Sequence, residues 1–587
     1  MEVKRTFDIL DYCLQERPLD VALAYKVQGS WKTYDTQTYK HISTNLSHGF
    51  LKLGLKREDK VAIISSNNRP EWNFIDMGLS MIGITSVPMY PTISEEDFRY
   101  IFNDSEVQYV FVSDKELYDK VKRVQPSVPT MKDVYTFNDV PGAKNWKEVE
   151  KLGKDNPDPE KLDACKKAVQ PDDLLTLIYT SGTTGTPKGV MLTHTNLVSN
   201  FVTGSKLTPF SYHDRALSFL PLCHVFERML IYLYQYQGLS LYYAESLDTI
   251  GDNIREIKPH TFTAVPRLIE KVYDKIIAGG NVKTGIQKLI FLWAVKVATE
   301  YDFDKGLWYR FKHFIADKLV YSKIRANLGG YLKCIVSGSA ALQPRLQRFF
   351  WAAKIPILEG YGLTETSPVI AVNLLGEGKT KFGTVGEVIT DVVVKIAEDG
   401  EILVKGPNVM KGYYKRADLT AEAIDKDGWF HTGDIGTFDG KMLKITDRKK
   451  EMFKTSGGKY ISPQPIENSF KESPYIEQIM VIGENQKHAS AYIVPTFAEV
   501  KKHMEAQGMK FGSNKELIAN KEVIKLIQEE INKYNQNLGK VEQIKRFELI
   551  DHEWTVDGGE LTPTLKPKRK IIMEKHKDLF TKIYGAN

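Results

Sequence analysis

Short apolar runs alternate with helical patterns through the first half of the chain. KVAIISS (60–66), TSVPMY (85–90) and VQYVFVSD (107–114) have the length and the β-branched content of buried strands. Ser94 and Asp97 have the spacing of a capping box, which predicts that a helix begins between two of these strands. Strands that alternate with helices need crossover connections, so the pattern predicts an α/β fold with doubly wound sheets.

The pattern changes in the second half. VVVKIAEDGEILVKG (392–406) and GTFDGKMLKITD (436–447) each place two apolar runs around an Asp-Gly pair, which is a hairpin signal. This predicts a β-rich, barrel-like module at about 375–447. A chain of 587 residues is too long to fold around a single hydrophobic core. We therefore expect a large N-terminal domain (1–447) and a small α+β C-terminal domain (448–587).

Composition excludes several classes of protein. The chain is 42% hydrophobic and 26% charged, as in ordinary globular proteins, and its net charge of +6 does not indicate nucleic-acid binding. Its four cysteines lie far apart without metal-ligand spacing, which favours a reducing cytoplasm. The charged N-terminus does not have the pattern of a signal peptide, and the longest apolar stretch (78–90) is too short to span a bilayer.

Two segments are locally basic. One is KPKRKIIMEKHKDLFTK (566–582), and the other is 283–325, which also contains many aliphatic and aromatic residues. Two interpretations stay open for these segments. They form a solvated helical face over a core, or they make a peripheral contact with an anionic membrane surface, on the inner face of the membrane.

The stretch YTSGTTGTPKG (179–189) follows the apolar run LLTLI and precedes a helix-like segment. Glycines let backbone N–H groups approach an anion, hydroxyls add donors, and Lys188 adds one positive charge, so the stretch predicts a phosphate-binding loop. It is not a Walker A loop, because Lys188 is followed by Gly189 instead of Ser or Thr. A flexible surface loop is the alternative.

Five motifs occur in a fixed order. They are TSGTTGTPKG (180–189), EGYGLTET (359–366), TGD (432–434), DRKKEMFKTSGGKYISPQPIE (447–467) and LTPTLKPKRK (561–570). Together they resemble the motifs of the adenylate-forming superfamily, which comprises acyl-CoA synthetases, luciferases and the adenylation domains of peptide synthetases. The resemblance covers nearly the whole chain. It implies ATP and coenzyme A as co-substrates, Mg²⁺ as cofactor, and a C-terminal domain that turns on a hinge at Lys450.

The motifs also make chemical sense individually. A reaction on a triphosphate needs its charge neutralised, and Glu365 is the natural Mg²⁺ carboxylate, with Thr180 as a second candidate ligand. Tyr361 offers a flat face to adenine, and Asp434 can accept from both ribose hydroxyls. Arg448 can donate to the ribose or a phosphate. The resemblance implies nucleotide and co-substrate contacts at Thr180, Ser181, Gly182, Thr183, Thr184, Gly185, Lys188, Ser339, Ala340, Glu359, Gly360, Tyr361, Gly362, Thr364, Asp434, Arg448, Gly457 and Gly458.

The same resemblance implies the catalytic residues. His224 in LPLCHVFER falls where the family has a His or an aromatic residue beside the carboxylate substrate, although a single His is more often only packed. Lys566 matches the catalytic lysine by register, with Lys568 and Lys570 as rivals, because Leu565 replaces the expected glycine. The catalytic set is then Lys566, His224, Thr364, Glu365 and Arg448. Gly457 and Gly458 fall on the loop expected to admit the pantetheine arm.

The motif variants are most similar to those of long-chain fatty acyl-CoA synthetases, which activate a fatty acid as acyl-AMP and pass it to coenzyme A. Other adenylate-forming ligases stay open, including those that load an acyl carrier protein or use aryl or medium-chain acids. A non-catalytic nucleotide-binding protein is less consistent with the presence of both Glu365 and Lys566. VSGSAA (336–341) has no GxSxG elbow, which disfavours a serine hydrolase.

Overall fold

The computed structural model describes most of the chain as two compact units. The described residues are 1–181, 186–246, 248–376, 378–556, 558–562 and 566–585. Gly182, Thr183, Thr184 and Gly185 of the predicted phosphate loop therefore lie outside them. Unit 1 consists of residues 1–395, 403–431 and 439–443, and unit 2 of residues 396–402, 432–438 and 444–587.

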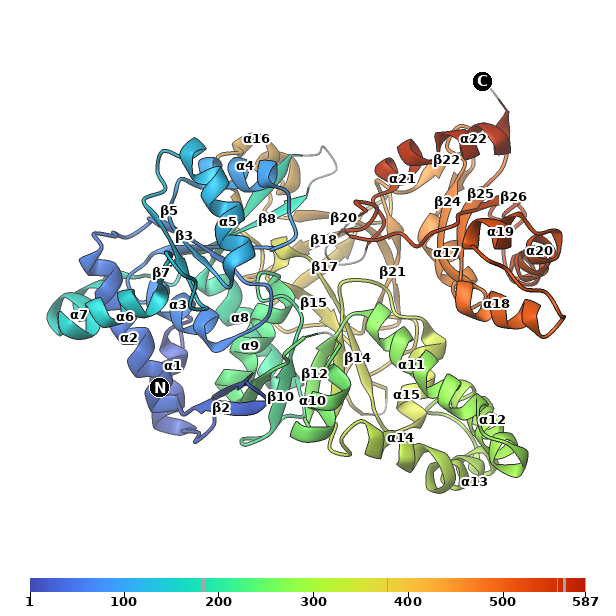
Figure 1. Cartoon of the computed structure of the whole chain (residues 1–587), viewed down its shortest axis with the longest axis horizontal. Helices are drawn as coiled ribbons and strands as arrows, with labels where there is room; N and C mark the ends of the chain where they lie inside the picture. The colour runs from blue at the N-terminus through green and yellow to red at the C-terminus, as the bar shows by residue number, and fades with distance from the viewer. Residues whose placement is uncertain (182–185, 247, 377, 557, 563–565, 586–587) are drawn as a thin grey trace. The chain divides into compact units, whose positions relative to one another are not determined.

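An eight-stranded sheet forms the first half of unit 1 (Figure 1). Its five central strands, β8, β4, β3, β5 and β6, are parallel, whereas β9 pairs antiparallel with both β8 and β19. The strand order is β19 (Gly412–Tyr413), β9 (Pro187–Thr193), β8 (Leu174–Ser181), β4 (Thr85–Met89), β3 (Lys60–Ile64), β5 (Val107–Val112), β6 (Asp133–Thr136) and β7 (Lys144–Asn145).

Helices cover both faces of this sheet, as a doubly wound sheet requires. Apolar residues of α4 (Glu95–Ser105) and α5 (Lys115–Val124) pack on one face, and those of α2 (Thr36–Lys52) and α3 (Pro70–Ser80) on the other. The predicted capping box of α4 is confirmed: Asp97 N–H donates to Ser94 Oγ at 3.0 Å, and Ser94 N–H to Asp97 Oδ2 at 3.4 Å. The strands predicted at 60–66, 85–90 and 107–114 are β3, β4 and β5.

A nine-stranded sheet forms the second half of unit 1. Six of its strands run parallel, and β2, β15 and β16 are antiparallel at its edges. α9 (Val225–Gln237) is buried almost throughout and shares one hydrophobic core with both large sheets. The strand order is β16 (Glu387–Val388), β15 (Val369–Val372), β14 (Ile357–Gly362), β13 (Cys334–Ser337), β12 (Thr261–Ala264), β10 (Arg215–Ser218), β11 (Ser240–Tyr243), β1 (Leu23–Val27) and β2 (Ser30–Tyr34).

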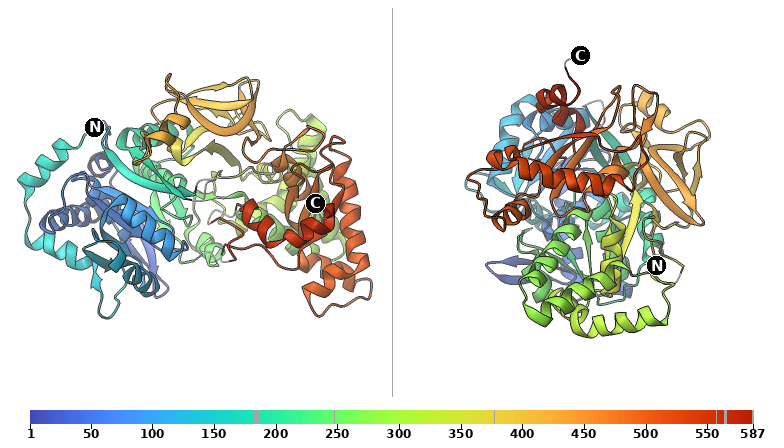
Figure 2. Two further views of the ribbon diagram at one scale, coloured as in Figure 1. Left: turned by 90° about the horizontal axis from the view of Figure 1, so that it is seen from above. Right: turned by 90° about the vertical axis from the view of Figure 1, so that its right-hand side faces the viewer.

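A separate core covers the outer face of the second sheet. It joins α10 (Ile250–Ile257), α11 (Pro266–Asn281), α12 (Gly285–Thr299) and α15 (Pro344–Ala352) to β12, β13 and β14. α13 (Leu307–Ala316), the π-helical turn η2 (Asp317–Tyr321) and α14 (Ser322–Asn327) complete this end of unit 1, visible in the two further views of Figure 2. No helix in the described ranges is both long enough and apolar enough to cross a membrane.

The β-rich module contains both predicted hairpins. A four-stranded sheet has the order β17 (Val393–Ile396), β18 (Glu401–Lys405), β20 (Phe430–Asp439) and β21 (Met442–Arg448). Gly400 and Gly440 occupy the two turns with φ of 86° and 65°, which a residue with a side chain rarely adopts. The Asp-Gly signals were therefore sufficient to locate these turns.

Unit 2 has its own α+β core, in agreement with the predicted fold class. A three-stranded sheet of β24 (Ile476–Ile482), β25 (Ser490–Pro495) and β26 (Arg546–Leu549) packs against α17 (Pro463–Phe470) and α20 (Lys521–Asn535). A small hairpin of β22 (Phe453–Lys454) and β23 (Tyr460–Ile461) precedes it. The four-residue turn of this hairpin contains Gly457 and Gly458.

Candidate nucleotide site

The predicted phosphate loop joins two strands of a hairpin. β8 ends at Ser181, β9 begins at Pro187, and Thr180 pairs with Lys188 across the antiparallel ladder. The helix-like segment predicted after the loop is α8 (His194–Leu207), but the strand β9, which lies between the loop and this helix, was not predicted. In β9 the buried Val190 and Leu192 lie on either side of the more exposed Met191, which is the alternation expected of a strand.

Lys188 and Glu365 of unit 1 meet through Tyr413. Tyr413 OH donates to Glu365 Oε1 at 2.9 Å, and Lys188 Nζ lies 5.1 Å from the centroid of the same ring. Burial and the neighbouring Glu365 raise the pKa of Tyr413 far above its usual value, so its hydroxyl keeps its proton and acts as a donor. One tyrosine thus holds a carboxylate and a lysine beside the strand end that carries Thr180.

The EGYGLTET motif begins on β14 and continues into a short 3₁₀ turn, η3 (Thr364–Thr366). Thr364 and Glu365 lie on η3, which contacts β9. Thr366 Oγ1 accepts from Leu363 N–H at 2.9 Å and donates to the Pro368 carbonyl at 2.6 Å, which fixes the turn.

The glycines of this motif differ in their surroundings. A Cβ at Gly362 would lie 1.7 Å from Pro368 O, so the chain's own backbone requires glycine there. At Gly360 a Cβ would make only ordinary contacts, the nearest at 3.4 Å to Ala371 O. Tyr361 stands between them on β14 and is half-buried.

Glu359 holds the loop that follows β13. Its Oε1 accepts from Leu342 N–H at 2.9 Å, and its Oε2 from Gln347 Nε2 at 3.1 Å. Burial raises the pKa of this carboxyl to about 8. Ser339, with a φ of 70°, and the exposed Ala340 lie on that loop, so Glu359 supports the residues predicted to flank adenine.

His224 is the N-cap of α9. Its Nδ1 accepts from Phe226 N–H at 3.1 Å, so in the neutral ring the proton is on Nε2. The loop before it is fixed by Asn68, whose Nδ2 donates to Leu220 O at 2.7 Å and to Ser218 Oγ at 2.8 Å.

The start of α9 also lies against the Ser339 loop, since a Cβ at Gly338 would meet the Phe226 ring at 3.0 Å and the Gly360 carbonyl at 3.5 Å. His224, Ser339 and Tyr361 therefore lie on three neighbouring segments of unit 1.

Arg228, one turn further along α9, is fully buried and was not singled out from the sequence. Its guanidinium donates to Asp76 Oδ1 at 2.5 Å on α3, to Ser86 Oγ at 3.0 Å on β4 and to Thr176 Oγ1 at 2.8 Å on β8. This buried, fully hydrogen-bonded pair connects the helix that His224 caps to the strand that leads into the phosphate loop.

Glu227 gives the fold a testable pH dependence. Its carboxyl is buried and accepts from Ser218 Oγ at 2.6 Å, and burial raises its pKa to about 8. The unfolded chain loses this proton near pH 4.3. The contribution of this carboxyl to stability is therefore fully present below that pH and falls by about 1.4 kcal/mol per pH unit until about pH 8.

We expect Glu227→Gln to weaken this dependence, because the amide has no proton to lose. Melting curves at pH 5.5 and pH 8.0 measure it: the loss of Tm between the two should shrink by several degrees in the variant. Glu96→Gln, on the exposed first turn of α4, should behave as the wild type. An unchanged loss in Glu227→Gln would assign the pH dependence to other groups.

In unit 2, three of the predicted residues lie together. Arg448 Nε donates to Asp434 Oδ1 at 3.0 Å, with Asp434 5% exposed and Arg448 44% exposed. Burial and the positive charge of Arg448 lower the pKa of Lys566 to about 8, while Asp434 and Glu451 act in the opposite direction. Lys566, which the resemblance indicates as the catalytic lysine, is thus a lysine whose pKa is lowered by its surroundings.

Neither glycine of the 455–458 turn is crowded. A Cβ at Gly457 would lie 3.9 Å from Thr455 Oγ1, and one at Gly458 would meet nothing within 4 Å. Gly458 has a φ of 74°, so the turn conformation itself favours glycine there. Lys450, the predicted hinge residue, is exposed and follows β21 by two positions.

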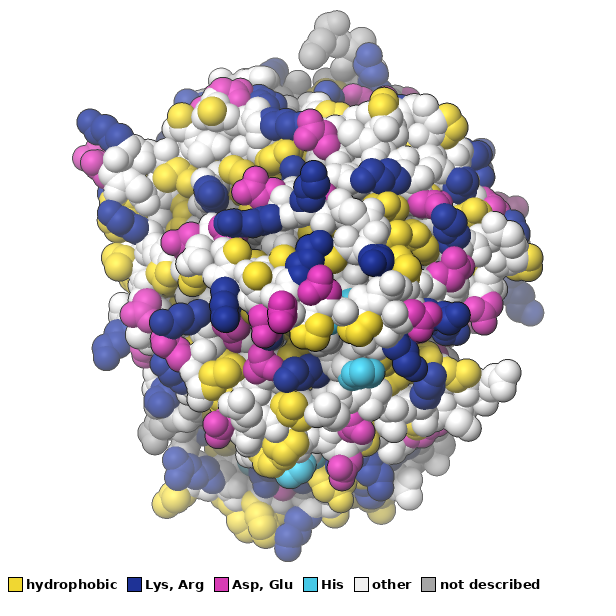
Figure 3. All heavy atoms as spheres, turned by 90° about the vertical axis from the view of Figure 1, so that its left-hand side faces the viewer, with side chains coloured by type: hydrophobic (Ala, Val, Ile, Leu, Met, Phe, Trp, Pro, Cys, Tyr) yellow, Lys and Arg dark blue, Asp and Glu magenta, His cyan; other side chains and the backbone are white. Residues whose placement is uncertain are grey.

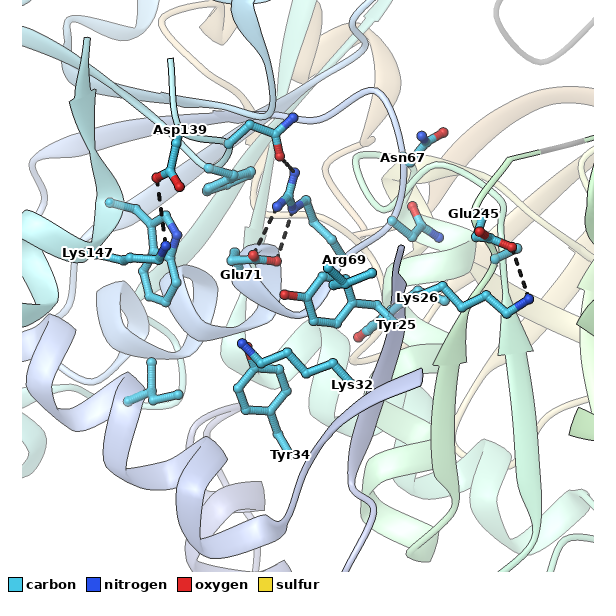
Figure 4. A pocket seen from close by; sticks show the side chains of 18 of the residues that line it. Tyr25, Lys26, Lys32, Tyr34, Asn67, Arg69, Glu71, Asp139, Lys147 and Glu245 are labelled. Carbon is cyan, nitrogen blue, oxygen red and sulfur yellow. Dashed lines mark hydrogen bonds and ion pairs between the residues drawn. The ribbon is translucent and has the colours of Figure 1, made fainter. Parts of the chain in front are cut away.

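A cavity of about 660 Å³ lies elsewhere in unit 1, and none of the predicted site residues that the structure describes lines it (Figure 4). Tyr25, Tyr34 and Trp146 form part of its wall. Many of its charges are paired with one another: Arg69 with Glu71 at 2.9 Å, Lys26 with Glu245 at 3.2 Å, and Lys147 with Asp139 at 3.7 Å.

Two large sheets with helices, followed by a separate α+β unit, make this a multi-unit α/β protein. The profile of the AMP-binding enzyme family matches residues 10–414, and that of the AMP-binding enzyme C-terminal domain matches residues 451–587. The chain belongs to the AMP-binding enzyme family.

Individual relatives are similar over nearly their whole length. The long-chain-fatty-acid–CoA ligase FadD15 of Mycobacterium bovis is 33% identical over 98% of this chain and 95% of its own. Long-chain-fatty-acid–CoA ligase 1 of Homo sapiens is 32% identical over 94% and 83%. Among solved structures, the anthranilate CoA ligase AuaEII, in complex with anthranoyl-AMP, has the same fold (TM-score 0.73, 18% identity, 97% of each chain).

Proposed function

We propose that this protein is a long-chain fatty acid–CoA ligase. A fatty acid and ATP form acyl-AMP and pyrophosphate, and the thiol of coenzyme A then displaces AMP to give acyl-CoA. The observation that carries the proposal is the Lys188–Tyr413–Glu365 contact beside the end of β8, because it brings a cation and a metal-binding carboxylate to the predicted triphosphate site. The named relatives support the choice of acid.

The predicted site residues of unit 1 have the chemistry needed to bind a nucleoside triphosphate with Mg²⁺. Glu365 accepts from Tyr413 through Oε1, and Mg²⁺ is usually held by one or two carboxylates together with substrate phosphates. The described residues contain no cluster of three metal-binding side chains, so phosphate oxygens would complete the shell. The ion, when bound, neutralises charge on the phosphates. Thr180 and Thr364 supply further oxygens, and Lys188 offsets the charge of the triphosphate.

The remaining residues bind the two ends of the adenylate. Tyr361 and the Ser339–Ala340 loop bind adenine, and His224 lies beside the carboxylate of the fatty acid, where its Nε2–H donates to the substrate oxygen. Asp434 accepts hydrogen bonds from the ribose hydroxyls. Arg448, which is paired with Asp434, orients the Asp434 carboxylate. Lys566 stabilises the negative charge that develops between the carboxylate and the α-phosphate.

We expect Tyr413→Phe to slow adenylation by about 10-fold or more, because a hydrogen bond to a charged group contributes about 1.5–3 kcal/mol. The variant keeps the ring beside Lys188 but no longer orients Glu365. ATP–pyrophosphate exchange measured against Mg²⁺ concentration checks this, since a poorly oriented Glu365 also raises the Mg²⁺ needed. Tyr414→Phe is the matched control. Equal rates in both variants would show that Glu365 does not depend on Tyr413.

The substrate is tested directly. The protein is incubated with ATP, coenzyme A and acids from acetate to C18 fatty acids, with anthranilate as an aryl acid, and AMP release is followed. We expect the highest kcat/KM with long-chain fatty acids. Reaction with the aryl acid but no fatty acid would replace the proposal by its alternative, an aryl acid–CoA ligase. Adenylate formation without transfer to coenzyme A would indicate a carrier-protein acceptor.

We also propose a cytoplasmic location. All four cysteines are free thiols, and burial raises the pKa of the Cys13 and Cys334 thiols to about 12, so they stay protonated. A protein with such unpaired thiols suits a reducing compartment.

A further inference from the structure

Unit 1 exposes a concentrated apolar surface on α12 and α13. Nine of the nineteen large apolar side chains that the described residues expose lie between residues 282 and 319. Leu307 is 84% exposed, Ile286 74% and Trp308 68%. We call this the α12–α13 surface; its side chains are Val282, Ile286, Leu289, Leu292, Leu307, Trp308, Phe311, Phe314 and Leu319.

The exposed apolar residues of α12 lie on a different face of the helix from its buried residues. On α12, Phe291, Ala294 and Val297 are buried among the residues of α15 and the second sheet. Ile286 lies five positions before Phe291 and Leu289 two positions before it, so both point away from this core, and both are mostly exposed. A helix that is apolar on all sides is normally buried on all sides. The outer face of α12 therefore has the composition of a surface that another apolar phase covers.

The same segment carries most of the chain's excess positive charge. Residues 282–325 contain nine lysines and arginines and four acidic residues, a net charge of +5 in a chain of net +6. Lys312 Nζ lies 5.4 Å from the centroid of the Trp308 ring, and Lys318 Nζ 4.6 Å from that of Phe314. By contrast, the face shown in Figure 3 intersperses cationic, acidic and apolar side chains.

We propose that the α12–α13 surface docks on a bilayer of anionic phospholipids. Its aromatic and aliphatic side chains enter the boundary between headgroups and acyl chains. Lys312 and Lys318, whose ammonium groups lie beside the rings of Trp308 and Phe314, contact the phosphates. Two of the four acidic residues of the segment, Asp302 and Asp317, form ion pairs with Arg348 and Arg325. Their negative charges therefore add little repulsion from an anionic surface.

Charge decides between a bilayer and a second copy of the chain. A self-complementary interface would place this excess of positive charge against itself, and like charges at a contact are unfavourable. An anionic bilayer supplies the opposite sign over the whole surface, at about 5-fold in affinity per lysine near it. α12 and α13 contact each other at one end of unit 1 (Figure 1), so their exposed side chains form one continuous region.

Vesicle flotation of the full chain tests the docking. We expect binding to vesicles of phosphatidylcholine with 30% phosphatidylserine, little binding to pure phosphatidylcholine, and weaker binding as salt rises. The variant Leu307→Ser/Trp308→Ser/Phe311→Ser should lose at least 10-fold in affinity. Its control, Ile524→Ser/Val541→Ser, removes exposed apolar side chains of unit 2 and should bind as the wild type.

The charges are tested separately. Lys312→Gln/Lys318→Gln should lose about 10-fold or more on anionic vesicles, whereas Lys154→Gln/Lys167→Gln, which neutralises two exposed lysines elsewhere, should not. Melting curves verify that each variant is folded. Equal binding to neutral and anionic vesicles, or unchanged binding of the triple variant, would overturn the proposal. A wild-type dimer that the triple variant converts to a monomer would assign the surface to a second copy.

The readout is binding and not catalysis, so it is independent of the proposed function. If the protein docks as expected but activates no fatty acid, only the assignment of the substrate fails.

Discussion

Lys566→Ala should abolish ATP–pyrophosphate exchange and leave the conversion of supplied acyl-adenylate and coenzyme A to thioester largely intact. The proposal assigns Lys566 to the charge that develops while the adenylate forms, and that charge is gone once the mixed anhydride exists. Losing such a contact typically costs a factor of about 10² or more. Lys570→Ala, an exposed lysine four positions further along, is the matched control and should change neither half-reaction.

The second half-reaction needs a complementary variant. The structure favours Gly457→Leu over a change at Gly458, since Gly458 has a φ of 74° and a side chain there would strain the turn by itself. At Gly457 the nearest atom to a Cβ is 3.9 Å away, so the hairpin should fold normally. We expect adenylate to form and accumulate in Gly457→Leu while thioester does not, because the new side chain obstructs the pantetheine arm.

The two variants together test whether the C-terminal unit serves the steps in two different orientations. Lys566 and Gly457 belong to the same unit but to different loops. If each variant loses one half-reaction, the two loops act at different steps. If a folded Lys566→Ala lost both half-reactions equally, a single arrangement would serve the whole reaction, and the alternating account would fail.

The pKa of Lys566 adds a pH signature. Because burial and Arg448 lower it to about 8, the free enzyme loses this positive charge as the pH rises above 8. Adenylation kcat/KM should therefore fall above pH 8, and in Lys566→Arg, whose guanidinium stays charged, the remaining activity should not show this fall. A wild-type profile that is flat between pH 7 and pH 9.5 would contradict the role of this lysine's charge.

The features that the sequence predicted correctly are those determined by interactions between residues close together in the chain. The capping box of α4 and the two Asp-Gly hairpins are specified by residues within four positions of each other, and the structure confirms them. Asp434, Arg448 and Lys566 were each predicted from a separate motif. The order of the motifs could not show that Arg448 and Lys566, more than a hundred residues apart, share one electrostatic environment.

Non-local pairing explains what the sequence did not predict. No strand was predicted between the phosphate loop and the helix that follows it, but Pro187–Thr193 pairs with β8 and β19 as a strand, and β19 lies more than 200 residues away. Tyr413 was missed for the same reason, since its partners Lys188 and Glu365 are 225 and 48 positions distant. Gly362 was predicted only as a nucleotide contact, and the sequence did not show that the Pro368 carbonyl, 1.7 Å from the position of a Cβ, itself requires glycine there.

Glu365→Gln should reduce adenylation by about 10² or more while the melting temperature changes little. The amide oxygen can still accept from Tyr413 OH, and the backbone of residue 365 keeps its bond from Met410 N–H at 2.8 Å, so η3 should remain in place. What is lost is the negative charge with which Glu365 would hold Mg²⁺ against the triphosphate, where the ion would supply charge neutralisation for the leaving pyrophosphate.

ATP–pyrophosphate exchange at increasing Mg²⁺, with melting curves beside it, separates a metal ligand from a structural residue. For a ligand, the Mg²⁺ concentration at half-maximal rate rises steeply and the fold is unaffected. A large fall in Tm with a modest loss of rate would make Glu365 a structural residue. Glu422→Gln, an exposed carboxylate on α16 (Ala417–Ala423), is the control for removing one charge near this part of unit 1. The double variant Glu365→Gln/Tyr413→Phe completes the test: if Tyr413 acts only by orienting Glu365, the second change adds nothing once the charge is gone.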